Sequence, residues 1–186
     1  ESRTYIFLEK VLTQGHPLGG WPAASVNEQV IDLRMDHRIV SSNAYSDLMI
    51  PALTDIPSIS VITDLDHLFH PETGIYVNAE GHGFAWEREC SVELIHPDGS
   101  AGFEVNGGLR IRGGWSRHAD FPKHAFRLFF RSEYGNAKLH FPLFGEEGVD
   151  RYDKIDLRCA QNYAWSNGYE RHTFLRDVFS RDLQGD

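Results

Sequence analysis

Residues 109–128, LRIRGGWSRHADFPKHAFRL, contain the pattern that decides the fold. Apolar and basic side chains alternate over residues 109–112 and again over residues 123–131, and a period of two predicts a β-strand with one apolar face at each place. Between them lie Gly113 and Gly114, and glycines let the backbone of a loop approach a ligand closely. The stretch therefore predicts a basic hairpin with a glycine hinge.

The loop of this hairpin has the properties of an anion site. Successive backbone N–H groups in a glycine-rich loop can form an anion-binding concavity, and positive charge is added by Arg112, Arg117, Lys123 and Arg127. The pattern is not a Walker loop, because the lysine lies on the following strand rather than at a helix start. It is closer to the glycine-rich hairpin of kinases. Spacing alone also fits a solvated hairpin with ordinary surface arginines.

The remaining pattern predicts an α+β fold with a mainly antiparallel sheet. Short β-patterns separated by turn signals occur at residues 58–63, 86–95, 103–105, 139–144 and 154–159. A helical pattern over residues 169–183 ends the chain. We expect this single C-terminal helix to pack on the sheet through an apolar stripe of Phe174, Leu175, Val178 and Phe179.

The first 55 residues differ from the rest. Residues 5–12 form an apolar run that predicts a strand, and a short amphipathic helix is expected from Asn43 onward. We interpret residues 1–55 as an extension that wraps around a domain formed by residues 56–186.

Composition limits the class of protein. The chain has 186 residues, is 41% hydrophobic and carries a formal net charge of −9. An acidic balance argues against nucleic acid as a partner, and no run approaches the roughly 20 apolar residues of a membrane-spanning helix. Both ends look like cuts within a longer protein. Cys90 and Cys159 are interpreted as two buried thiols, with a single bridge as the alternative.

Three other motifs are weak. Asp64 is best explained as the cap of a short helical turn, and His67 and His70 lack a further ligand at metal spacing, so no metal site is predicted. Ser116, His118 and Asp120 could suggest a hydrolase triad. This interpretation is rejected because no nucleophile elbow surrounds Ser116.

Several segments together resemble the CotH (spore-coat protein H) kinase-like family, in particular the module carried by large multidomain secreted bacterial proteins. The similar segments are residues 56–61, 74–78, 86–88, 91–94, 108–114, 116–117, 122–124, 126–128, 134–135, 143–145 and 157–158.

The resemblance implies the small, N-terminal lobe of an atypical protein-kinase fold that binds ATP with Mg²⁺ or another divalent metal. It implies phosphate transfer to a protein substrate, a remaining catalytic lobe in the parent chain, and an extracellular or cell-surface location. The catalytic and metal-binding aspartates are expected beyond residue 186, so this portion alone is expected to be inactive. The implied nucleotide-binding residues are Arg112, Gly113, Gly114, Ser116, Lys123 and Arg127.

The loop also supports an alternative. Trp115 follows Gly114 where many members of the family have a small polar residue. A large side chain there is compatible with a module that has lost catalysis and serves as a binding or structural unit on the cell surface.

Overall fold

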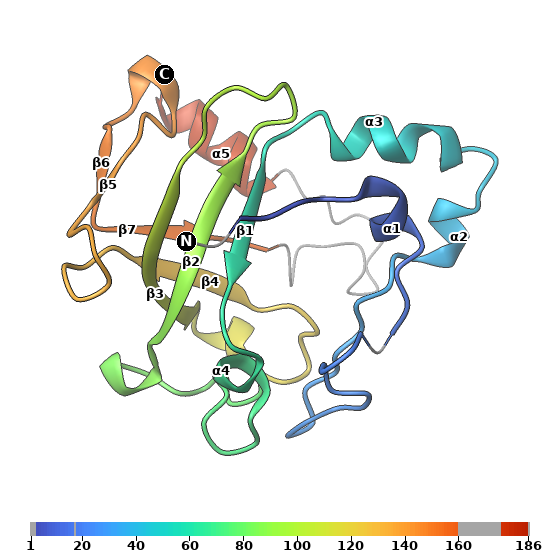
Figure 1. Ribbon diagram of the computed structural model, residues 1–186, viewed down its shortest axis with the longest axis horizontal. Helices are drawn as coiled ribbons and strands as arrows, with labels where there is room; N and C mark the ends of the chain where they lie inside the picture. Colours follow the sequence, from blue (N-terminus) through green and yellow to red (C-terminus); the bar gives the residue numbers. More distant parts are fainter. Residues whose placement is uncertain (1–2, 17, 160–175, 186) are drawn as a thin grey trace.

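A five-stranded antiparallel sheet forms the centre of the protein (Figure 1), as a computed structural model shows. The structure describes residues 3–16, 18–159 and 176–185. The strand order is β1-β2-β3-β4-β7, so sequential strands are neighbours until β4, and β5 and β6 form a separate two-stranded ribbon. The bounds are β1 Ser58–Ile62, β2 Arg88–Ile95, β3 Glu104–Arg112, β4 Ala125–Phe129, β5 Leu139–His140, β6 Arg151–Tyr152 and β7 Lys154–Leu157. The predicted α+β class and antiparallel sheet are confirmed.

The helices of the described residues are short, and most precede the sheet or connect its strands. Their bounds are α1 Leu8–Leu12, α2 His37–Val40, α3 Met49–Leu53, α4 Leu65–Phe69 and α5 Arg176–Gly185, with 3-10 turns η1 Ser46–Leu48, η2 Phe84–Trp86, η3 Trp115–Arg117 and η4 Gly145–Glu147. Asp64 caps α4, its side chain accepting a hydrogen bond from the backbone N–H of Asp66. This confirms its interpretation as a helix cap.

The strand register divides the sheet into two faces. Val92 lies opposite Val105, and Leu109 lies opposite Leu128. Directly opposed residues share a face, so these four belong to one apolar surface, which we call the core face. Three of its members are almost completely buried: Val92, Leu109 and Leu128. The other surface, the outer face, takes the alternate residues, including Arg110, Arg127 and Asp156.

The N-terminal extension has its own small cluster. Ile31 packs with Phe69 and Val77, which belong to α4 and the turn that follows it. Gln29 is also buried, and its amide donates to the carbonyl of Phe121 at 3.0 Å. The extension therefore reaches the segment that connects β3 to β4.

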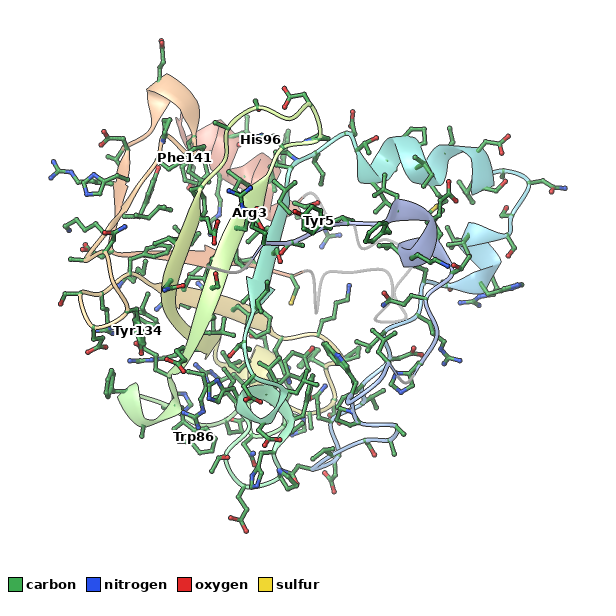
Figure 2. The ribbon with its side chains drawn as sticks, in the orientation of Figure 1. Arg3, Tyr5, Trp86, His96, Tyr134 and Phe141 are labelled. Atoms are coloured by element: carbon green, nitrogen blue, oxygen red, sulfur yellow. The ribbon has the colours of Figure 1, made fainter. Side chains whose placement is uncertain are left out.

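The strand predicted over residues 5–12 is wrong. Leu8–Leu12 is helical, and Tyr5 and Phe7 are exposed. Instead of pairing with β1, the chain crosses the outer face (Figure 2): Thr4 bonds the side chains of Glu93 and Ser60. Five residues of mixed polarity fit one helical turn as well as a strand, and without a ladder partner the local hydrogen bonds of the helix prevail.

The expected C-terminal helix is present, but its expected packing on the sheet is not borne out. A helix is present over Arg176–Gly185, but Val178 is 53% exposed and Phe179 is 64% exposed. These two side chains therefore do not anchor the helix to the sheet, and the prediction is wrong for them. Phe174 and Leu175 lie outside the described residues.

Several strand boundaries also differ from those predicted. The two patterns at 103–105 and 109–112 are parts of one strand, β3, because Asn106, Gly107 and Gly108 continue the ladder. The strands expected over residues 139–144 and 154–159 end at His140 and Leu157. No disulfide joins Cys90 and Cys159, and only Cys90 is buried, so the interpretation as two buried thiols is wrong for Cys159.

Candidate anion-binding site

Arginines lie side by side on the outer face of the sheet. Arg110 of β3 is directly opposite Arg127 of β4, which is directly opposite Asp156 of β7. We call Arg110, Arg127 and Asp156 the arginine row. Like charges at directly opposed positions repel each other, so this arrangement needs compensation by negative charge.

Two carboxylates supply that compensation from opposite ends. Glu87, in the segment just before β2, contacts Arg110 Nη2 at 2.5 Å. Asp156 accepts hydrogen bonds from Arg127 Nε at 2.5 Å and Nη2 at 2.8 Å, and from Arg112 Nε at 2.9 Å. These bonds, with the one from Arg127 first, lower the pKa of Asp156 to about 2. Each arginine of the row is therefore held by a carboxylate on the side away from the other arginine.

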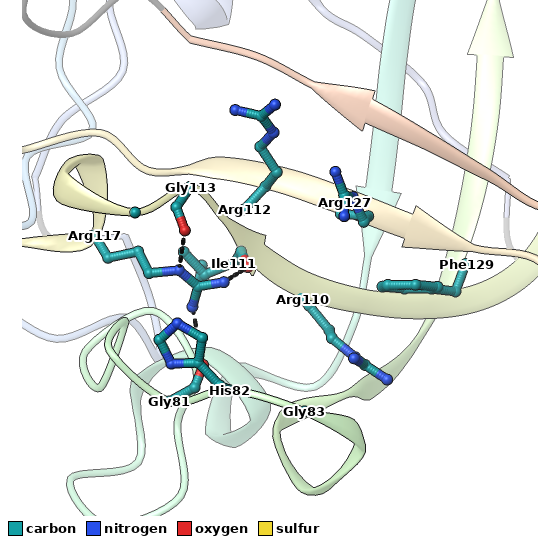
Figure 3. A pocket seen from close by; sticks show the side chains of 11 residues that line it. Gly81, His82, Gly83, Arg110, Ile111, Arg112, Gly113, Arg117, Arg127 and Phe129 are labelled. Carbon is teal, nitrogen blue, oxygen red and sulfur yellow. Dashed lines mark hydrogen bonds between the residues drawn. The ribbon is translucent and has the colours of Figure 1, made fainter.

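A cavity of about 470 Å³ lies over the row, within the range of about 300–1,000 Å³ typical of ligand sites. In Figure 3, Arg112 and Arg127 extend toward β7, whereas Arg110 extends toward the loop that contains Gly83. No carboxylate is among the residues that line this cavity: Gly81, His82, Gly83, Arg110, Ile111, Arg112, Gly113, Gly114, Arg117, Arg127 and Phe129. Four arginines thus line a space that no acidic residue lines.

Arg117 joins two walls of the cavity. Its Nε donates to the Gly113 carbonyl at 2.7 Å and its Nη2 to the Ile111 carbonyl at 2.5 Å. Its Nη1 donates to the carbonyls of Ala79 at 2.7 Å and Gly81 at 2.9 Å, and Figure 3 shows three of these contacts. All four of these acceptors are neutral carbonyls, and burial lowers the pKa of Arg117. This arginine therefore fixes the glycine turn against the loop at residues 79–83.

Glycines make both walls possible. Gly113 has φ +126°, a region that L side chains rarely adopt, and a Cβ there would lie 2.1 Å from Ser116 Oγ. In the opposite wall, a Cβ on Gly81 would lie 2.2 Å from the ring of Trp86. A side chain at either position would force the wall to move.

The glycine turn is also tied to the N-terminal extension. His124 is buried, with Nδ1 3.1 Å from the Ser116 carbonyl and Nε2 2.7 Å from Gln29 Oε1. Burial lowers the pKa of His124. The extension therefore supports the turn from behind, through a polar contact that the sequence did not indicate.

The structure brings together four of the six predicted nucleotide-binding residues. Those that line the cavity are Arg112, Gly113, Gly114 and Arg127. Ser116 lies behind the turn, next to Gly113, and Lys123 is exposed just before β4; neither lines the cavity. Their contact with a nucleotide stays a prediction.

Several residues of the site were not assigned from sequence. Arg110 was placed on the same strand face as Arg112 but was not given a role, although alternation alone could have included it. Glu87 and Asp156 come from segments distant in sequence, and no local pattern marks them as partners of the arginines. Arg117, expected to add charge to a loop, is instead buried.

The donors present fit an anion. Arg110 Nε is buried and has no hydrogen-bond partner within the described part of the chain. For the divalent metal, the described residues contain no group of three or more His, Cys, Asp or Glu that could hold it. The fit therefore extends to phosphate groups and not to a metal held by these residues.

The chain matches no protein-family model, no curated protein and no solved structure with which it was compared. Among the described residues, no helix has the length and apolar character needed to cross a bilayer.

Proposed function

We propose that this chain is the phosphate-binding portion of an atypical, ATP-dependent protein kinase of the CotH type, with the nucleotide phosphates seated over the arginine row. The observation that carries the proposal is the direct opposition of Arg110 and Arg127 beside a cavity that no carboxylate lines. Bound phosphate oxygens would relieve the repulsion between these two cations and accept charge-assisted hydrogen bonds.

The glycine turn supports the same reading. Gly113 and Gly114 border the cavity with little side-chain bulk, so a ligand can approach the backbone there. The lining of the cavity contains four arginines, in a chain whose formal net charge is −9. A local cationic surface on an acidic protein concentrates anions at that place.

The role proposed for this chain is limited to phosphate binding. Phosphoryl transfer needs metal ions and a positioned acid group, and these are assigned, with the protein substrate, to the remaining catalytic lobe of the parent protein. The extracellular or cell-surface location rests on the resemblance alone.

The test is titration calorimetry of the chain with ATP and with inorganic pyrophosphate at low salt. Arg127→Ala is expected to weaken binding of both at least about tenfold, the loss of one charge-assisted contact. Arg38→Ala is the control, because Arg38 is an exposed arginine that pairs with Asp36, the residue that caps α2. Equal affinity of the wild type and Arg127→Ala would refute the proposal.

Lys123→Ala belongs in the same series. A weakening comparable to that of Arg127→Ala would assign Lys123 to the ligand, as the resemblance implies. Unchanged affinity would remove Lys123 from the site and leave the arginines as its cations.

A further inference from the structure

We propose that Glu87 is a positioning residue of the anion site, which holds Arg110 in the orientation that phosphate requires. The inference rests on the proposed function, because it concerns the same cavity. It adds a residue that does not line that cavity and whose charge has the wrong sign for an anion site.

Glu87 is among the most enclosed charged groups of the described structure, with a side chain only 1% exposed. Its two oxygens contact three side chains: Arg110 Nη2 at 2.5 Å, Arg131 Nε at 3.1 Å and the Tyr134 hydroxyl, which donates at 3.0 Å. Burial and the Glu87 carboxylate raise the pKa of Tyr134 to about 12, so this hydroxyl stays a donor at neutral pH. The carboxylate is fixed from several directions.

The backbone leaves room for this carboxylate. Gly108 lies on the outer face of β3, two residues before Arg110, and a Cβ there would be 2.4 Å from Glu87 Oε1. Only glycine at position 108 therefore allows Glu87 to lie flat against the strand. Tyr134, which completes the contacts, lies at the same end of the sheet as Trp86 (Figure 2).

Arg110 is controlled from two sides by this arrangement. Its guanidinium stacks on the ring of Phe129, 4.4 Å from the ring centroid, and its Nη2 is held by Glu87. Phe129 and Arg110 both line the cavity, whereas Glu87 does not. Because Nη2 is held by Glu87 and the guanidinium lies on the Phe129 ring, the side chain of Arg110 is fixed in one orientation. We infer that Glu87 sets the rotamer that offers Arg110 to the ligand.

A purely electrostatic effect of Glu87 and a positioning role predict opposite changes in anion affinity for Glu87→Gln. Removing a negative charge near an anion site strengthens anion binding by Coulomb attraction. Loss of the charge that orients Arg110 weakens it. The sign of the change in affinity therefore separates the two effects.

The experiment measures pyrophosphate binding by calorimetry for Glu87→Gln, Arg110→Ala and the double variant, with thermal melts to establish that each is folded. We expect Glu87→Gln to bind about tenfold more weakly. In the Arg110→Ala background, Glu87→Gln should cause no further weakening, because the residue that it orients is gone. A merely structural role would weaken binding in both backgrounds.

The charge control is Glu80→Gln. The charge of Glu80 partly opposes the lowering of the Arg117 pKa by burial, so Glu80 lies near the cavity, but it makes no ion pair with the described residues. Its replacement should leave binding unchanged or up to about threefold tighter. If Glu87→Gln behaves like Glu80→Gln, the positioning role is refuted.

Gly108→Ala provides a second route if Glu87→Gln does not fold. It keeps every charge and displaces the Glu87 carboxylate, and it should weaken pyrophosphate binding like Glu87→Gln. Gly19→Ala is the matched control, since a Cβ at Gly19 meets nothing within 4 Å. If the wild type binds pyrophosphate and Gly108→Ala binds it equally well, the positioning role of Glu87 is refuted and the proposed function stands. If the wild type binds no pyrophosphate, the proposed function is refuted, and this inference with it.

Discussion

The two faces of β3 and β4 use the same alternation for different purposes. On the core face, Leu109 and Leu128 are opposed and almost fully buried, so their contact contributes to stability. On the outer face, the next opposed pair is Arg110 and Arg127, whose like charges repel each other. A sheet can therefore hold an unfavourable pair in place with stability derived from its other side.

Substitutions that act on one face only test this difference between the two faces. Core-face replacements should change the free energy of unfolding and leave anion affinity unchanged in the folded protein. Outer-face replacements should change anion affinity and leave the free energy of unfolding unchanged. The exception is a buried group that contributes to both stability and binding.

The largest effect on stability is expected for Leu128→Ala. Truncating a fully buried leucine removes apolar burial and leaves a cavity, which costs about 2–5 kcal/mol. Urea denaturation measures this loss, and pyrophosphate titration of the folded variant should match the wild type. A cost below about 1 kcal/mol would show that the core face is less well packed than the structure indicates.

Arg117→Met should combine both kinds of effect. The substitution keeps an unbranched side chain and removes the donors to four carbonyl groups, so we expect a loss of about 2–3 kcal/mol. Because the two walls of the cavity are no longer joined, affinity for pyrophosphate should also fall. Stability and affinity that are both unchanged would contradict the role given to Arg117.

Asp156→Asn should have a smaller effect that depends on pH. The folded pKa of Asp156, about 2, lies below the unfolded value of about 3.9. Its ion pairs therefore stabilise the fold fully above about pH 4, and this contribution is lost as the pH falls toward 2. Since these side chains are a quarter to a third exposed, we expect a difference of only about 1 kcal/mol at pH 7.

The check is urea denaturation of the wild type and Asp156→Asn at pH 7, 5 and 3. The difference between the two should be the same at pH 7 and pH 5 and smaller at pH 3. A difference that grows on acidification would have the wrong sign for this ion pair.

The smallest effect is expected away from both faces, at Phe179→Asp. Packing of the helical stripe on the sheet would make this substitution cost several kcal/mol, but a side chain that is 64% exposed predicts a change within about 0.5 kcal/mol. Thermal melts distinguish the two values. A large loss would mean that Phe179 is covered in solution.

Local pattern was sufficient for the sheet and for part of the site. Alternation located β1, β2 and β4, and it placed Arg110 and Arg112 on one face, because a period of two is a property of the strand itself. The same reasoning failed at residues 8–12, where a run of five cannot distinguish a strand from one helical turn. It also failed for Phe179, since amphipathicity does not specify what covers the apolar stripe.

The compensating groups were beyond sequence reasoning. Glu87 and Asp156 reach the arginines only because β2 and β7 flank β3 and β4 in the folded sheet. Arg117 illustrates the same point from the other direction: a basic residue in a glycine loop suggests exposure, and only the tertiary structure supplies the four carbonyls that make its burial possible.

The space reserved at Gly108 has a consequence for descent. A side chain at position 108 collides with the carboxylate of Glu87, so this glycine cannot change alone without loss. Across related sequences, a lineage that replaces the glycine should also have replaced the glutamate.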